Sequence, residues 1–207
     1  QHTFRHRFAQ ILSLVGERTP DPVRVIAISE VFDDAQTRDV LAAYQLQQTA
    51  HDVRTQLVLV CRDGFTLRDD LPGVRVVREA QVPLSQIIDA EREKAAGAIV
   101  AILSPSAVYG RHYLQDAVHA VRYSGAAVVG KSPGGIEYEW GQPLDPRSLV
   151  ISTEVMAASG LTAGALLDDR GGLVRSFAPK SYAFDSANFA VVDPSADRGM
   201  LLKKIEI

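Results

Sequence analysis

Short runs of apolar residues alternate with longer amphipathic segments along the chain, and this alternation constrains the fold more than any other feature. The apolar runs lie at residues 23–29, 56–61, 74–77, 98–103 and 126–130. Helical spacing of apolar residues marks the segments at 35–48, 84–96 and 113–123. Strands that alternate with helices of this length predict βαβ units. The expected fold is therefore α/β and Rossmann-like, with a mixed, mostly parallel sheet and helices on both faces.

The remaining parts of the chain give weaker structural signals. We expect an N-terminal helix that ends at Gly16 and a short helix at 153–158. Short strands are expected at 136–140, 149–152, 181–183 and 190–192. The tail from residue 193 onward has few signals of either kind, so no element is predicted there.

Length, charge and cysteine content exclude several classes of function. A chain of 207 residues can form one domain with a buried core. Its formal net charge of −3 gives no electrostatic basis for binding nucleic acid. No apolar run approaches the ~20 residues that span a bilayer. Cys61 is the single cysteine, so no internal disulfide forms, which fits a cytoplasmic location. Because the chain begins with Gln1, we expect it to be part of a longer protein.

Ligands of open parallel sheets bind beyond the carboxyl ends of the strands, so the residues that follow the apolar runs are the first candidates for a site. These candidate pocket residues are Ser29, Glu30, Arg62, Asp63, Ser104 and Ser106. None of them belongs to a glycine-rich phosphate-binding loop. His112 and His119 share a predicted helix but lack a third ligand within sequence reach, and we predict no metal site there.

Several segments of the sequence resemble one known family. Residues 96–101, 108–114 and 123–131 are similar to segments of family 2 glycosyltransferases, which have the GT-A fold. The opening at 2–7 resembles the first helix of bacterial members, and residues 182–189 resemble the family's Tyr-x-x-Asp-Arg-x-Asn-Phe strand and loop. The resemblance implies a GT-A domain over 1–193, with an N-terminal helix at 1–16, a nucleotide-binding-like half at 17–131, an acceptor-like half at 132–193 and a tail at 194–207.

The positions that match these family segments are framework positions. They are Gly97, Tyr109, Gly110, Tyr113, Gly130, Lys131, Asp185 and Asn188. Their order along the chain makes the resemblance more specific than any single segment.

The positions that bear charge in the family are replaced here. The family places aspartates directly before its Tyr-Gly-x-x-Tyr-Leu segment, and two of them hold Mn²⁺ or Mg²⁺ against the nucleotide-sugar diphosphate; here these positions, 104–107, read Ser-Pro-Ser-Ala. The expected Gly-Gly-Thr acceptor segment reads Asp-Pro-Arg-Ser at 145–148, and the family arginine before Asn-Phe is Ser186. The catalytic base has no clear counterpart, and Asp168 and Asp169 are the candidates for a shifted one.

Together these replacements imply a glycosyltransferase-like domain that has lost transferase activity, with no cofactor and no metal. Such a pseudoenzyme would serve as a binding or assembly scaffold in a glycan-related or larger multidomain bacterial protein. Its expected partner is another domain or subunit, for example an active glycosyltransferase. Nucleotide sugars should bind weakly, because Glu30 and Asp63 repel a diphosphate and Arg62 can pair with either carboxylate.

Two other interpretations stay open at the level of sequence. The first is an active, metal-independent glycosyltransferase that uses a nucleotide-sugar donor, with Arg62, Arg111 or Lys131 neutralising the diphosphate. The second is a Rossmann-like domain for a different ligand, which the missing glycine-rich fingerprint disfavours.

Overall fold

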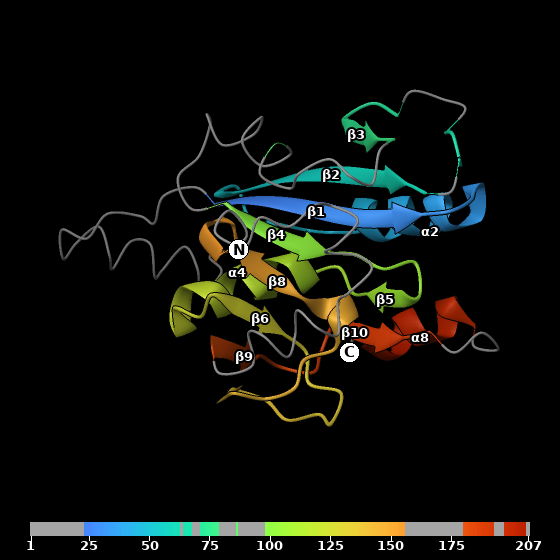
Figure 1. Cartoon of the computed structure of the whole chain (residues 1–207). Helices are drawn as coiled ribbons and strands as arrows, with labels where there is room; N and C mark the ends of the chain where they lie inside the picture. The colour runs from blue at the N-terminus through green and yellow to red at the C-terminus, as the bar shows by residue number, and fades with distance from the viewer. Residues whose placement is uncertain are drawn as a thin grey trace.

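The protein folds around an eight-stranded mixed sheet, shown in Figure 1. The computed structural model describes residues 23–62, 64–67, 71–78, 86, 98–155, 180–192 and 197–205. The strand order is β3-β2-β1-β4-β8-β6-β9-β7. This arrangement confirms the predicted mixed, largely parallel α/β sheet.

The parallel half of the sheet contains four predicted strands. They are β1 (Val23–Val31), β2 (Val53–Cys61), β3 (Val74–Val77) and β4 (Ile99–Ile102). β1 lies at the centre of this half, with Val25 opposite Thr55 of β2 on one side and Ile99 of β4 on the other. Both faces of β4 are buried, as its continuous apolar run predicts.

The second half of the sheet is mixed. β8 (Val150–Ser152) runs antiparallel between β4 and β6 (Val128–Gly130), so β6 is parallel to β4. β9 (Ser181–Ala183) pairs parallel with β6, and β7 (Glu139–Trp140) is the last strand of the sheet. The strand predicted at 136–140 is thus confirmed only at its end.

Two well-formed helices cover one face of the sheet. α2 (Asp34–Gln45) begins after Asp33, whose carboxylate accepts a hydrogen bond from Gln36 N at 2.7 Å. α4 (Tyr113–Ser124) ends at Gly125, which has a φ of 65°. Apolar side chains of both helices pack in one cluster with the β1 side chains that point to that face. A second cluster lies on the opposite face. The helices predicted at 84–96, apart from residue 86, and at 1–16 fall outside the described residues.

The elements β5 (Ala107–Tyr109) and α8 (Arg198–Ile205) were not predicted from the sequence. β5 forms a separate two-stranded sheet with β10 (Phe189–Val191). The C-terminal tail contains α8, which buries none of its residues. Within the part of the chain that the structure describes, no helix has the length and apolar character needed to cross a bilayer.

Candidate functional site

Three parallel strands bring the predicted pocket residues to one edge of the sheet. The arrowheads of β1, β2 and β4 point to the same side in Figure 1. Backbone pairing continues past β2, where Arg62 N donates to Val31 O at 3.1 Å. It continues past β4 as well, where Leu103 N donates to Ile28 O at 2.9 Å. The residues that follow β2 and β4 therefore flank the end of β1, as parallel topology requires.

Glu30 and Arg62 form an ion pair at this edge. Arg62 Nη1 lies 2.8 Å from Glu30 Oε1, and the two side chains are 18% and 8% exposed, respectively. A close pair in such a partly desolvated setting interacts more strongly than one in water. The Arg62 charge is therefore balanced by a protein carboxylate.

The side chains of Ser104 and Ser106 bond to each other. Ser104 Oγ and Ser106 Oγ lie 2.9 Å apart, and Ser106 N donates to Ser104 Oγ at 3.3 Å. Ser104 is 4% exposed, and Ser29, on the neighbouring strand, is fully buried. The polar groups of this segment thus stabilise its own turn.

This residue set does not fit a divalent cation. Mg²⁺ and Mn²⁺ sites need anionic oxygen ligands, whereas Ser104 and Ser106 offer neutral hydroxyls that already share a hydrogen bond. The carboxylate of Glu30 is engaged by Arg62. Across the described ranges, no group of three or more His, Cys, Asp or Glu residues could hold a metal ion.

Tyr109 and Tyr113 connect the 104–107 segment and helix α4 to a distant turn. Tyr109 Oη accepts a hydrogen bond from Ser104 N at 2.7 Å and donates to Arg147 O at 2.6 Å. Tyr113 Oη donates to Ser148 O at 2.8 Å, and burial raises the pKa of Tyr113 well above its ordinary value, which keeps the hydroxyl a donor. The tyrosines therefore position backbone at the site, which is a framework role.

The turn at 145–148 is tightly built. It is the 3₁₀ helix η1 (Pro146–Ser148), capped by buried Asp145. Two hydrogen bonds of 2.8 and 2.7 Å join the Arg147 guanidinium to the Asp145 carboxylate. Ser148 Oγ accepts from Lys131 N at 2.8 Å, which ties the turn to the end of β6. The sequence analysis did not predict this 3₁₀ helix, although an aspartate before a proline is a typical helix start.

Lys131 is buried and paired. Its Nζ lies 3.1 Å from Asp185 Oδ1 and donates to Asp185 O at 2.5 Å, and it stands 3.7 Å from the centroid of the Phe184 ring. Burial lowers the pKa of Lys131, while Asp185 acts in the opposite direction. Since Lys131 is only 2% exposed, its charge serves this internal contact.

Close packing explains the glycines at positions 110 and 130. Gly110 N donates to Asn188 O at 2.9 Å, and a Cβ on Gly110 would meet Asn188 Oδ1 at 2.2 Å. A Cβ on Gly130 would lie 3.2 Å from Ser148 O. Asn188 has a φ of 59°, and its Nδ2 donates to Asp116 Oδ2 at 2.8 Å. Asp116 has a structural role that the sequence did not indicate.

Replacing Asp116 with Asn should stabilise the protein near neutral pH. Burial raises the pKa of Asp116, so its ionisation costs stability as the pH rises through the folded-state pKa. Asn keeps an oxygen acceptor for Asn188 Nδ2 but cannot ionise. Unfolding by urea should therefore show a gain for the variant near neutral pH, and that gain should vanish below the ordinary aspartate pKa of about 3.9.

The control for this prediction is Asp34→Asn, on the exposed first turn of α2. A carboxylate there interacts favourably with the helix N-terminus, so its removal should lower stability slightly at neutral pH. A loss of stability in Asp116→Asn that is equal at both pH values would contradict the assigned burial effect.

Some predicted site residues lie outside the described residues. They are Asp63, Gly97, Asp168 and Asp169. A residue that the sequence did not indicate, Arg198 of α8, contacts the site segment instead. Its Nη2 donates to Pro105 O at 2.5 Å and to Ala107 O at 2.9 Å, and its Nη1 pairs with Asp39.

Solved structures with similar folds include a mannosyltransferase and TarS. A mannosyltransferase from Pyrobaculum calidifontis, in complex with GDP-Man and Mn²⁺, superposes with a TM-score of 0.56 at 15% identity, covering 93% of this chain and 65% of that chain. Residues 1–349 of S. aureus TarS in complex with UDP give a TM-score of 0.54 at 11% identity, covering 83% and 61% of the two chains. The complex with UDP-GlcNAc gives 0.53 at 11% identity, covering 84% and 60%.

Comparisons by sequence add no relative. No protein-family model matches the chain. No curated protein matches it either. At these identities the structural likeness establishes the fold, and this chain spans between 60% and 65% of the lengths of those three proteins. The chain therefore has the mixed, largely parallel α/β fold of GT-A glycosyltransferases.

Proposed function

We propose that this chain is a glycosyltransferase-like domain that has lost metal-dependent transfer and serves as a binding or assembly scaffold. The strongest support is that the polar side chains at the strand ends interact with one another. Glu30 is paired with Arg62, and the hydroxyls of Ser104 and Ser106 bond to each other. The groups that would meet a nucleotide diphosphate are thus engaged within the protein.

Transfer from a nucleotide sugar releases a nucleoside diphosphate, whose growing negative charge must be offset. The structurally similar mannosyltransferase was solved with both GDP-Man and Mn²⁺. In this chain the family's metal-binding positions hold Ser104 and Ser106, and no carboxylate stands at 104–107. This segment therefore offers no anionic ligand to a metal ion that would assist glycosyl transfer.

A metal-independent transferase would instead need basic side chains directed at the diphosphate. Two of the three candidates from the sequence are committed to protein carboxylates, because Arg62 pairs with Glu30 and Lys131 with Asp185. Binding a diphosphate would require one of these pairs to break and would leave a carboxylate beside the phosphate charges. The geometry therefore favours a scaffold over a metal-independent enzyme.

Internal contacts keep the segments near the strand ends in a fixed conformation. Tyr109 and Tyr113 hold the 104–107 and 145–148 segments in place, and Gly110 packs closely against Asn188. We infer that residues 1–193 act as one unit with a nucleotide-binding-like half at 17–131 and an acceptor-like half at 132–193. The same unit would bind another domain or subunit of a larger protein.

Restoring the family's carboxylates tests this proposal. The double variant Ser104→Asp/Ser106→Asp should gain Mn²⁺-dependent binding of UDP or GDP in calorimetric titrations, because two carboxylates supply hard anionic ligands. The matched control, Ser104→Asn/Ser106→Asn, has nearly the same size without the charge and should gain nothing. Mn²⁺-dependent binding by the unaltered chain, at a level equal to the Asp variant, would contradict the proposal.

A further inference from the structure

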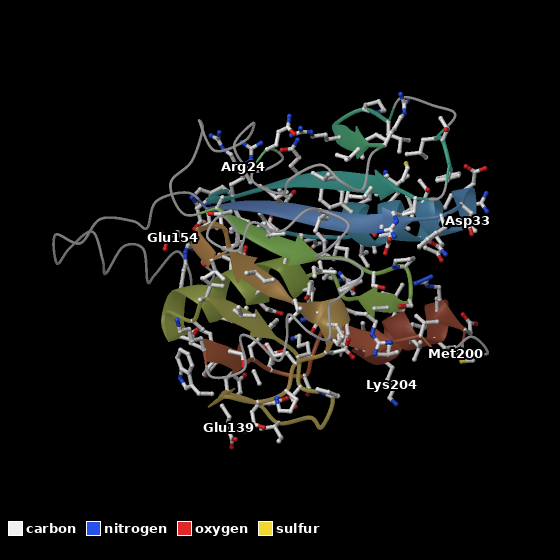
Figure 2. The ribbon with its side chains drawn as sticks, in the orientation of Figure 1. Arg24, Asp33, Glu139, Glu154, Met200 and Lys204 are labelled. Atoms are coloured by element: carbon white, nitrogen blue, oxygen red, sulfur yellow. The ribbon has the colours of Figure 1, made fainter. Side chains whose placement is uncertain are left out.

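The C-terminal helix α8 lies against the turn that carries Ser104 and Ser106. It contacts β5, the strand that follows this turn, and β10, the strand that pairs with β5. Figure 2 labels Met200 and Lys204 on α8, and both side chains point away from the rest of the molecule. Met200 is 68% exposed. One side of the helix therefore faces the candidate site, and the other side faces solvent.

A single side chain of α8 makes three polar contacts with two distant segments. Arg198 Nη2 donates to Pro105 O at 2.5 Å and to Ala107 O at 2.9 Å. Its Nη1 donates to a carboxylate oxygen of Asp39, on α2. A planar guanidinium meets several acceptors at once in this way, because its donors form a rigid fork. Arg198 therefore joins α8 to α2 and to the turn after β4.

The C-terminal residues bond to three consecutive carbonyl groups of the 104–107 turn. Besides the two hydrogen bonds from Arg198, Val192 N donates to Ser106 O at 3.0 Å. Ala107 is 2% exposed, and a buried carbonyl that loses its donor costs free energy because it has given up its contact with water. The present conformation of the turn thus depends on the contacts of Arg198.

The helix itself is weakly attached. α2 and α4 both bury side chains against the sheet, whereas α8 buries none of its residues. A helix of eight residues has little stability of its own in water. The ion pair is partly solvated, since the Arg198 and Asp39 side chains are 30% and 42% exposed, and pairs of this kind are weak and screened by salt. Undocking of α8 therefore costs far less free energy than unfolding of the sheet.

We propose that α8 is a latch: Arg198 docks the helix and fixes the 104–107 turn, and undocking of the helix releases the turn while the sheet stays folded. The helix and the turn open together because they lose the same contacts. The latch controls the conformation of the segment that carries Ser104 and Ser106. It goes beyond the proposed function, because it holds for whichever ligand or partner the chain binds.

Amide hydrogen exchange of the full chain, followed residue by residue by NMR, measures the undocking. The amides of residues 201–205 should be at least about 100-fold less protected than the Ile102 amide, which donates to Leu149 O in the sheet. The Ala107 amide donates to Ser104 O, and its protection should match that of α8. Low concentrations of urea should speed exchange at Ile102 and not at α8, because undocking exposes little surface.

Arg198→Met removes the three contacts and keeps much of the side-chain volume. Exchange at residues 201–205 and at Ala107 should become about tenfold faster, the effect expected when hydrogen bonds from a charged donor are lost. Ile102 should remain far more protected than α8 in this variant, which shows that the sheet is folded. Arg38→Met is the matched control, because Arg38 is an exposed arginine next to Asp39 on α2, and it should leave the exchange of α8 unchanged.

Salt provides a second signature of the latch. Raising the NaCl concentration from about 0.05 M to about 0.5 M should speed exchange of α8 in the unaltered chain, because salt screens the pair of Arg198 with Asp39. The same change should have little effect on Arg198→Met, which lacks this pair.

Equal protection of residues 201–205 and Ile102 in the unaltered chain would overturn the proposal, because α8 would then detach only when the sheet unfolds. An Ala107 amide as protected as that of Ile102, beside a poorly protected α8, would show that the turn does not open with the helix. Unchanged exchange of α8 in Arg198→Met would remove Arg198 as its anchor. None of these results depends on nucleotide-sugar binding, so the latch and the proposed function can fail independently.

Discussion

Replacing Arg62 with Met is expected to lower the free energy of unfolding by roughly 3 kcal/mol, the usual loss when one member of a buried ion pair is removed. Arg62 lies 2.8 Å from Glu30, whose side chain is 8% exposed. Met fills much of the same volume but leaves the Glu30 carboxylate without this cation in a poorly solvated place. Urea unfolding followed by circular dichroism measures the loss.

The double variant Glu30→Leu/Arg62→Met is the control. It removes both charges and retains apolar volume, so it should be much closer in stability to the unaltered chain than Arg62→Met is. In the single variant, protonation of Glu30 at acid pH should recover part of the loss. A loss below about 0.5 kcal/mol, the level of an exposed surface pair, would show that this ion pair is not held in a desolvated site.

Adding one methyl group at Gly110 is expected to cost roughly 2–3 kcal/mol, in the range of overpacked cores. The new Cβ would meet Asn188 Oδ1 at 2.2 Å and Asn188 Cα at 3.0 Å. Rotation of the amide could relieve the first clash, but it would break the 2.8 Å hydrogen bond to Asp116. The second clash involves backbone and requires the loop before β10 to move.

Gly134→Ala is the matched control for Gly110→Ala. A Cβ on Gly134 would meet its nearest neighbours at 3.8 and 3.9 Å, which is ordinary contact. Its stability should change by less than about 0.5 kcal/mol, as for most surface substitutions. If Gly110→Ala were equally mild in urea unfolding, the tight contact with Asn188 would not be a reason for the glycine.

The core of the fold follows from sequence pattern because local and tertiary preferences agree there. The apolar run that gives β4 is short, continuous and bounded by breaks, which predicts a strand buried on both faces, as the structure has it. β3 was predicted with its observed bounds from the valines at 74, 76 and 77 and the glycine that precedes them. Parallel pairing then places Glu30 beside Arg62, which the sequence analysis anticipated as a potential pair.

Elements that depend on distant partners could not be predicted in this way. β5 has three residues and exists because β10, far along the chain, pairs with it from Phe189 to Tyr109. α8 has no buried residue and therefore no strong apolar stripe to recognise. Arg198 joins this helix to the 104–107 segment through backbone carbonyls, which carry no sequence signature.

Some features of the candidate site could be predicted from the sequence, and others could not. The strand-end residues could be predicted because topology alone brings them to one edge. The contacts of Tyr109 with Arg147 and of Asn188 with Asp116 could not, because each joins residues widely separated in sequence. The resemblance identified these framework positions, and the structure supplies the physical reason for them.

Calorimetric titration of the unaltered chain with UDP- and GDP-sugars, with and without Mn²⁺, tests the central claim most directly. With Glu30 and Arg62 paired and with serines at the metal-binding positions, dissociation constants should be weaker than about 1 mM, or above about −4 kcal/mol, under both conditions. Micromolar binding of a nucleotide sugar, followed by turnover that Arg62→Ala abolishes, would contradict the scaffold assignment and establish a metal-independent transferase.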